Sequence, residues 1–290
     1  MAGNALVLGG GGALGIAWEV GLLAGLLEEG VDTTGADLIV GTSAGSVVGT
    51  QIALGEPLVE LLAEQVAPDD GAIARLIQID LQGTQQIFMR WAGIREVTPE
   101  VRREIGEMAL GAKTVSEQSW VEYFEERLDG KTWPERDLRI TAVHCDSGDF
   151  EVWTRESGVS LARAVASSCA VPGLFPAVSI DGRRYTDGGV RCGTSADLAK
   201  GYDAVLIVAP IGARQDGIDP LLGRQARQEA EALQAAGSRV ELVFPDAGSL
   251  EAMGFNRMDG ARRGVSAEAG MVQGRALAAR LAEGWAKAAA

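Results

Sequence analysis

The sequence Gly-Thr-Ser-Ala-Gly at residues 41–45 limits the fold more than any other stretch of the chain. The mostly apolar residues 36–40 before it are typical of a buried strand, and residues 46–54 after it are typical of a helix. A serine between strand and helix with a glycine on each side fits a nucleophile elbow, because so tight a turn leaves no room for a flanking Cβ. The helix N-terminus would then direct free N–H groups at an anion formed on Ser43. The pattern predicts an α/β fold with a catalytic serine.

Three further Gly-x-Ser sequences end at Ser160, Ser195 and Ser266. They lack the second glycine and the setting between strand and helix. Glycine is common in this chain, with 39 residues, so the context carries more weight than the motif. Of these serines, only Ser43 has both features.

A nucleophilic serine needs a base. The single histidine is His144. In an α/β-hydrolase the order is Ser, acid and then His, so the acid would have to lie between Ser43 and His144. A histidine-dependent esterase stays open as an alternative. The other candidate is Asp187, which ends a predicted strand and opens the one Asp-Gly-Gly sequence. Two glycines allow a tight turn and a close approach, and a desolvated aspartate can act directly as the base.

Four consecutive glycines at residues 9–12 follow a predicted strand over residues 4–8 and precede a predicted helix over residues 16–29. The N–H groups of Gly10, Gly11 and Gly12 can converge on an oxyanion there. The spacing Gly10-x-Gly12-x-x-Gly15 also satisfies the dinucleotide-binding pattern. That fold needs an acidic residue at the end of its second strand, and the sequence has none there. A nucleotide-binding module is the alternative from another class.

The order of predicted elements begins with strand, loop and helix twice over, which is typical of a parallel sheet flanked by helices. Residues 58–130 are predicted to be helical, and their apolar positions fit either helices packed on the sheet or a cap that admits an acyl chain. We expect one domain over residues 1–290. Further predicted elements are strands at residues 138–143, 150–154, 178–180, 184–186, 204–209 and 240–244, and an Ala-rich helix from about residue 267.

The chain is acidic, with a formal net charge of −14. Such a charge repels phosphate backbones and anionic membranes, so no nucleic-acid partner is expected and membrane contact should be transient and apolar. The cysteines at positions 145, 169 and 192 form no Cys-x-x-Cys pair, and no targeting signal is evident, which favours a cytoplasmic location. No cluster has metal-ligand spacing, so neither metal nor cofactor is expected. The sequence carries no signal for an oligomeric state.

Four blocks in this order, at residues 8–15, 41–46, 166–176 and 187–189, resemble the patatin-like phospholipases. These are lipid acyl hydrolases that use a Ser–Asp dyad without histidine. The resemblance implies their three-layer α/β architecture with a mostly parallel central sheet and a helical cap region. It also implies hydrolysis of carboxylic esters of lipids, of the phospholipase A, lysophospholipase or esterase type.

By residue, the resemblance makes Ser43 the nucleophile, Asp187 its base, and the amides of Gly10, Gly11 and Gly12 the oxyanion hole. The expected reaction passes through an acyl-enzyme on the serine. One departure is Leu14, which stands where the family commonly has Lys or Arg. This position therefore supplies no cation that could anchor the glycine loop or select a lipid head group.

Overall fold

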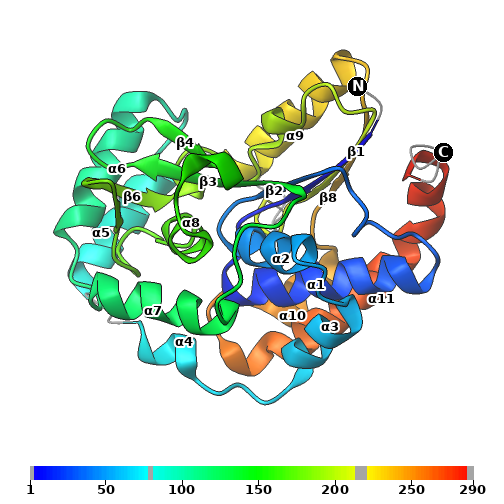
Figure 1. The fold of residues 1–290 in the computed structure, drawn as a ribbon, viewed down its shortest axis with the longest axis horizontal. Coiled ribbons are helices and arrows are strands. Elements are labelled where there is room, and N and C mark those ends of the chain that lie inside the picture. The colour runs from blue at the N-terminus through cyan, green and yellow to red at the C-terminus, as the bar shows by residue number, and fades with distance from the viewer. Residues whose placement is uncertain (1–2, 78–80, 213–220, 286–290) are drawn as a thin grey trace.

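A computed structural model describes residues 3–77, 81–212 and 221–285 (Figure 1). Its centre is an eight-stranded sheet with the order β5-β6-β3-β2-β1-β7-β8, and β4 pairs with β3. From β8 through β7, β1 and β2 to β3 the strands run parallel, whereas β4 and β6 are antiparallel to β3. The strands are β1 (Asn4–Leu8), β2 (Leu38–Gly41), β3 (Asp137–His144), β4 (Phe150–Trp153), β5 (Val178–Ile180), β6 (Arg183–Asp187), β7 (Ala204–Val208) and β8 (Arg239–Val243).

Helices cover both faces of this sheet, and the prediction of a mostly parallel sheet flanked by helices is confirmed. The region predicted to be helical, residues 58–130, contains α3 to α7. The helices are α1 (Gly12–Glu28), α2 (Ala44–Ala53), α3 (Leu58–Val66), α4 (Ala72–Arg75), α5 (Leu81–Ala92), α6 (Pro99–Gly111), α7 (Glu117–Leu128), α8 (Leu161–Ser168), α9 (Leu221–Ala235), α10 (Ala247–Met253) and α11 (Arg263–Trp285).

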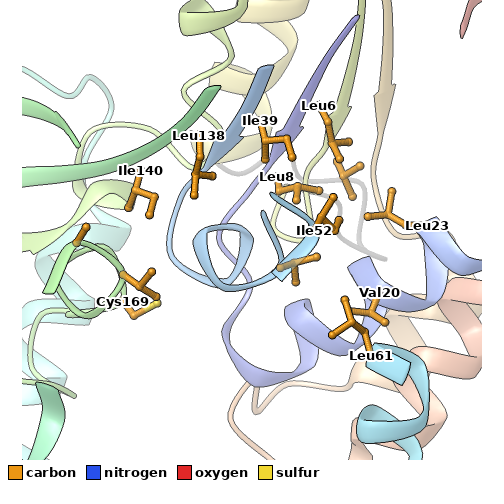
Figure 2. Packing of buried hydrophobic residues seen from close by; sticks show 14 of the residues in the cluster. Leu6, Leu8, Val20, Leu23, Ile39, Ile52, Leu61, Leu138, Ile140 and Cys169 are labelled. Carbon is orange, nitrogen blue, oxygen red and sulfur yellow. The ribbon is translucent and has the colours of Figure 1, made fainter. Parts of the chain in front are cut away.

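The side chains of the central strands alternate between two apolar layers, as strand geometry requires. In β1, Leu6 and Leu8 join the larger core, where Figure 2 shows them with residues of β2, β3 and the helices α1, α2 and α3. Ala5 and Val7 point to the opposite face and pack with residues of α9. These parallel strands are thus buried on both faces, which explains their continuous apolar sequences.

Helix α1 starts at Gly12, inside the glycine loop, and not at residue 16 as the apolar spacing predicts. The Gly15 N–H already donates to the Gly11 carbonyl oxygen at 3.0 Å. Helix α11 lies along α1 in Figure 1 at backbone contact, since a Cβ on Gly21 would lie 2.0 Å from the Ala267 carbonyl oxygen. This close pairing fixes α1, and with it the position of the glycine loop.

Candidate active site

Ser43 occupies a strained turn between β2 and α2. Its φ of 52° and ψ of −117° are angles that a residue with a side chain rarely adopts. A Cβ on Gly41 would lie 2.5 Å from the Ser46 Cα, and one on Gly45 would lie 2.0 Å from the Leu8 carbonyl oxygen. The turn therefore excludes a side chain on both flanks, as the sequence predicts for a nucleophile elbow.

Residues of the 166–176 block hold the serine backbone. The Ser43 N–H donates to the Ser168 hydroxyl oxygen at 2.9 Å, and the Cys169 thiol donates to the Ser43 carbonyl oxygen at 3.3 Å. Burial raises the pKa of the Cys169 thiol far above its usual range, so it stays neutral and serves in packing. The Ser46 hydroxyl also donates to the Ser43 carbonyl oxygen, at 2.7 Å. Sequence reasoning gave Ser168 no role, because a support of this kind comes only from tertiary contact.

Asp187 ends strand β6 with its side chain buried. Its Oδ1 accepts a hydrogen bond from the Gly189 N–H at 2.7 Å. Burial raises the pKa of Asp187 to about 7, while the Ser43 hydroxyl and the Gly189 N–H act against this rise by favouring the carboxylate. The Ser43 hydroxyl is thus a neighbour of the carboxyl group. No hydrogen bond of standard geometry reaches Oδ2 from any described residue.

Strand β3 lies between the strands that carry Ser43 and Asp187. The Thr141 hydroxyl of β3 forms a hydrogen bond of 2.7 Å with the Thr42 hydroxyl, next to the serine. On the other side, a Cβ on Gly188 would lie 2.1 Å from the same Thr141 hydroxyl oxygen. Thr141 therefore sets the spacing between the two segments. The first glycine after Asp187 permits the close approach that the sequence predicts.

The glycine loop lies directly against the serine, since a Cβ on Gly10 would lie 3.4 Å from the Ser43 Cβ. The Gly10 N–H donates to the Gly193 carbonyl oxygen at 2.9 Å, so it is not free to bind an oxyanion, contrary to its expected role. The N–H groups of Gly11 and Gly12, at the start of α1, have no acceptor among the described residues. The Ala44 N–H, at the start of α2, likewise has no acceptor among the described residues. The sequence did not indicate this group as part of the oxyanion hole.

A cavity of about 440 Å³ opens beside the serine, with Gly12, Ser43 and Ala44 in its wall. Much of the lining is apolar. Helices α3, α4 and α7 of the 58–130 region contribute Leu61, Ile73, Trp120 and Phe124. The Trp120 ring stacks on Phe175 with centroids 3.9 Å apart, and its N–H donates to the Ala166 carbonyl oxygen at 2.9 Å. The helical region therefore forms part of the wall of this cavity.

Residues 6–200, which are 195 of the 290 residues, match the family model for patatin-like phospholipases. The chain belongs to this family. All four predicted blocks lie within the matched range.

Two curated relatives of this patatin-like chain are fungal lysophospholipases named nte1. The protein of Aspergillus niger is 28% identical over 221 residues, and that of Aspergillus fumigatus is 29% identical over 222 residues. Each match covers 75% of this chain but 12% of the relative, so the chain spans a small part of the length of these proteins.

Solved structures similar to the patatin-like chain are distant in sequence. VipD from Legionella pneumophila has a TM-score of 0.49 and 15% identity, covering 97% of this chain and 67% of VipD. The type III effector ExoU has a TM-score of 0.37 and 17% identity, covering 94% of this chain and 53% of ExoU. Family membership rests on the family model and not on these likenesses.

His144 lies away from the elbow of this patatin-like chain, at the end of β3. Its Nδ1 is 2.7 Å from the Ser147 hydroxyl oxygen, and its Nε2 is 3.6 Å from the Asp146 carboxylate. Both partners belong to the turn between β3 and β4. The His144 ring also lies beside the Tyr185 ring of β6, with centroids 5.4 Å apart. None of these described partners of His144 is Ser43 or Asp187.

A second buried carboxyl lies near the glycine loop. Glu19 of α1 is fully buried, and neither of its oxygens has a hydrogen-bond partner of standard geometry among the described residues. Burial raises the pKa of Glu19 well above its usual range, and the Gly9 backbone opposes this only in part. Burial therefore favours the neutral form of the Glu19 carboxyl.

Leu14, at the position where the patatin-like family commonly has a cation, is fully buried, and its N–H donates to the Arg257 carbonyl oxygen at 3.0 Å. Arg257 and Met258 also lie beside Gly12, where a Cβ would be 2.9 Å from the Arg257 carbonyl oxygen and the Met258 sulfur. The start of α1 is therefore anchored by this C-terminal segment.

Within residues 3–77, 81–212 and 221–285, no helix is both long and apolar enough to cross a membrane. The same residues hold no group of three or more His, Cys, Asp or Glu side chains arranged to bind a metal ion.

Proposed function

We propose that this chain hydrolyses carboxylic esters of lipids through a Ser43–Asp187 dyad. The observation that carries the proposal is the pairing of a strained serine turn with a buried carboxyl whose pKa lies at about 7. A base of that pKa is half ionised at neutral pH, where it can both accept and return a proton. Membership of the patatin-like phospholipases and similarity to lysophospholipases support lipid esters as the substrate class.

In the proposed reaction, Asp187 takes the hydroxyl proton of Ser43 while the serine oxygen attacks the ester carbonyl carbon. The N–H groups of Gly11, Gly12 and Ala44 would stabilise the negative charge that develops on the carbonyl oxygen. Collapse of this intermediate releases the alcohol, which carries away the proton, and leaves an acyl group on Ser43. Water then attacks the acyl carbon while Asp187 takes one of its protons. Collapse breaks the bond to the Ser43 oxygen, which receives that proton from Asp187, and the carboxylic acid departs.

We further propose that residues 58–130 form a cap within one patatin-like domain. Apolar side chains of α3, α4 and α7 form part of the cavity wall, which also carries charged side chains, so the wall offers apolar contacts to an acyl chain and polar ones to a head group. The cap would also limit access of water to the serine, which is 8% exposed.

Hydrolysis of soluble p-nitrophenyl esters of increasing chain length, and of a lysophospholipid, tests the proposal. Ser43→Ala and Asp187→Asn should each abolish turnover, and His144→Ala should keep the parental rate because its contacts lie elsewhere. Near-normal turnover by either dyad variant, once folding has been verified by circular dichroism, would rule out the dyad.

A further inference from the structure

The loop between α10 and the short helix Gly260–Arg262 carries a fully exposed phenyl ring, that of Phe255. Its relative exposure of 106% means that no part of the fold covers the ring. Burying a ring of this size is one of the larger favourable contributions that a single side chain can make, so exposing it stabilises nothing within the chain. A partner outside the chain would explain its position.

This loop continues directly into the wall of the active-site cavity. Three residues after Phe255, the Met258 side chain lines the cavity next to Gly12. Between them, the Arg257 carbonyl oxygen accepts the Leu14 N–H at the start of α1. Phe255 thus lies two positions before Arg257, which contacts the glycine loop.

Other exposed apolar side chains lie on segments joined to this loop. Arg263, at the start of α11, donates to the Glu64 carbonyl oxygen and to Gln65 at the end of α3, and all three residues line the cavity. The neighbouring Arg262 donates to the Ala252 carbonyl oxygen at the end of α10. Figure 1 shows α3 and α10 on the same side of the molecule. Gly264 lies against the end of α3, since a Cβ on Gly264 would be 3.7 Å from the Val66 Cα. We define the mouth patch as Phe255 of the loop, Val66 at the end of α3 and Val265 of α11, all of which are exposed and lie within three residues of a residue that lines the cavity.

The charged residues around the cavity limit which lipid surfaces the mouth patch can bind. The cavity lining includes five carboxylates and three cations: Glu56, Glu60, Glu64, Asp69 and Asp70 against Arg127, Lys131 and Arg263. The three cations pair with Asp70, Glu56 and Asp69, at 3.9, 2.6 and 3.9 Å. Together with the net charge of −14, this excess of carboxylates repels an anionic surface.

We propose that the mouth patch docks on the surface of a zwitterionic lipid aggregate, with Phe255 inserted among the lipids, so that a substrate ester can pass into the cavity. This inference rests on the proposed lipid ester hydrolase function. Aromatic rings are favoured at the boundary between lipid and water, and insertion of apolar residues needs no anionic lipid. Docking therefore depends weakly on salt and does not strengthen with anionic lipid.

The test is binding to phosphatidylcholine vesicles, measured by co-flotation in a Ser43→Ala background so that the vesicles stay intact. Phe255→Ser should weaken binding about tenfold, a factor that partial burial of one ring can supply. Phe255→Trp should keep the parental affinity. Met89→Ser is the matched control, because Met89 is 67% exposed on α5, on the side of the molecule away from α3 in Figure 1, and it should change binding less than twofold.

With Ser43 intact, Phe255→Ser should reduce hydrolysis of vesicle lipid but leave hydrolysis of a soluble short-chain ester unchanged. Parental vesicle binding by Phe255→Ser would overturn the inference. Binding that rises with added phosphatidylserine and falls with salt would also overturn it, as would a change in oligomeric mass that identified a second copy as the partner. If no ester is cleaved but Phe255 still controls vesicle binding, the proposed function fails and the docking surface stands.

Discussion

The pH dependence of ester hydrolysis is the most quantitative consequence of where Asp187 lies. Burial raises the pKa of this carboxyl from 3.8 to about 7. A shift of that size corresponds to about 4 kcal/mol of extra free energy needed to ionise the group in the folded protein. The proposed reaction needs the carboxylate form, so activity should follow the ionised fraction.

With a pKa of about 7, roughly one eleventh of the carboxyl groups are ionised at pH 6 and roughly ten elevenths at pH 8. We therefore expect kcat/KM for a soluble ester to rise about tenfold between these two pH values and to level off above them. Initial rates at substrate concentrations well below KM, corrected for hydrolysis by hydroxide, give this profile directly.

His144→Ala is the control, because His144 is the single histidine of the chain. The acid limb should persist in this variant at the parental pKa. A limb near pH 4 would mean that the Asp187 carboxyl is solvated and not buried. Loss of the limb in His144→Ala would assign the titration to the histidine.

Three further changes test separate parts of the structure. Ser43→Gly should abolish hydrolysis yet stabilise the fold by about 1 kcal/mol, because glycine adopts the φ of 52° without strain. The stabilisation should appear as a Tm higher by about 2–4 °C. An unchanged or lower Tm would contradict the strain. Glu19→Gln should flatten the dependence of stability on pH between 5 and 8. Burial raises the pKa of Glu19 in the folded protein above that of the unfolded chain, so this carboxyl lowers the parental stability as the pH rises above about 4.3. Urea unfolding that showed the parental slope in the variant would exclude this. Gly45→Ala should lower the free energy of unfolding by about 3 kcal/mol, since its Cβ would lie 2.0 Å from the Leu8 carbonyl oxygen. A parental Tm would show that the elbow tolerates a side chain.

The elements around the elbow could be predicted because local sequence determines them. The strand before Ser43 is apolar and short, the flanking glycines allow the turn, and a helix follows. Strand β6 was predicted over residues 184–186, and the turn after Asp187 was predicted from Asp-Gly-Gly. The family resemblance then related two positions that are far apart in the chain.

What the sequence could not provide is the partner of each polar group. Gly10 looks equivalent to Gly11 in the sequence, but its N–H is taken by the Gly193 carbonyl oxygen, which tertiary folding brings alongside. In the same way, no local pattern signals that Ser168 receives the Ser43 N–H or that Glu19 is buried without partners among the described residues. Contacts between distant segments decide these features.

The most direct test of the Ser43–Asp187 dyad is labelling by a fluorophosphonate probe, with the modified residue found by peptide mass spectrometry. The reagent reacts with a serine whose hydroxyl is activated by a base. We predict labelling of Ser43 in the parental protein and in His144→Ala, and loss of labelling in Asp187→Asn. Labelling at a different serine, or at the parental rate in Asp187→Asn, would contradict the dyad.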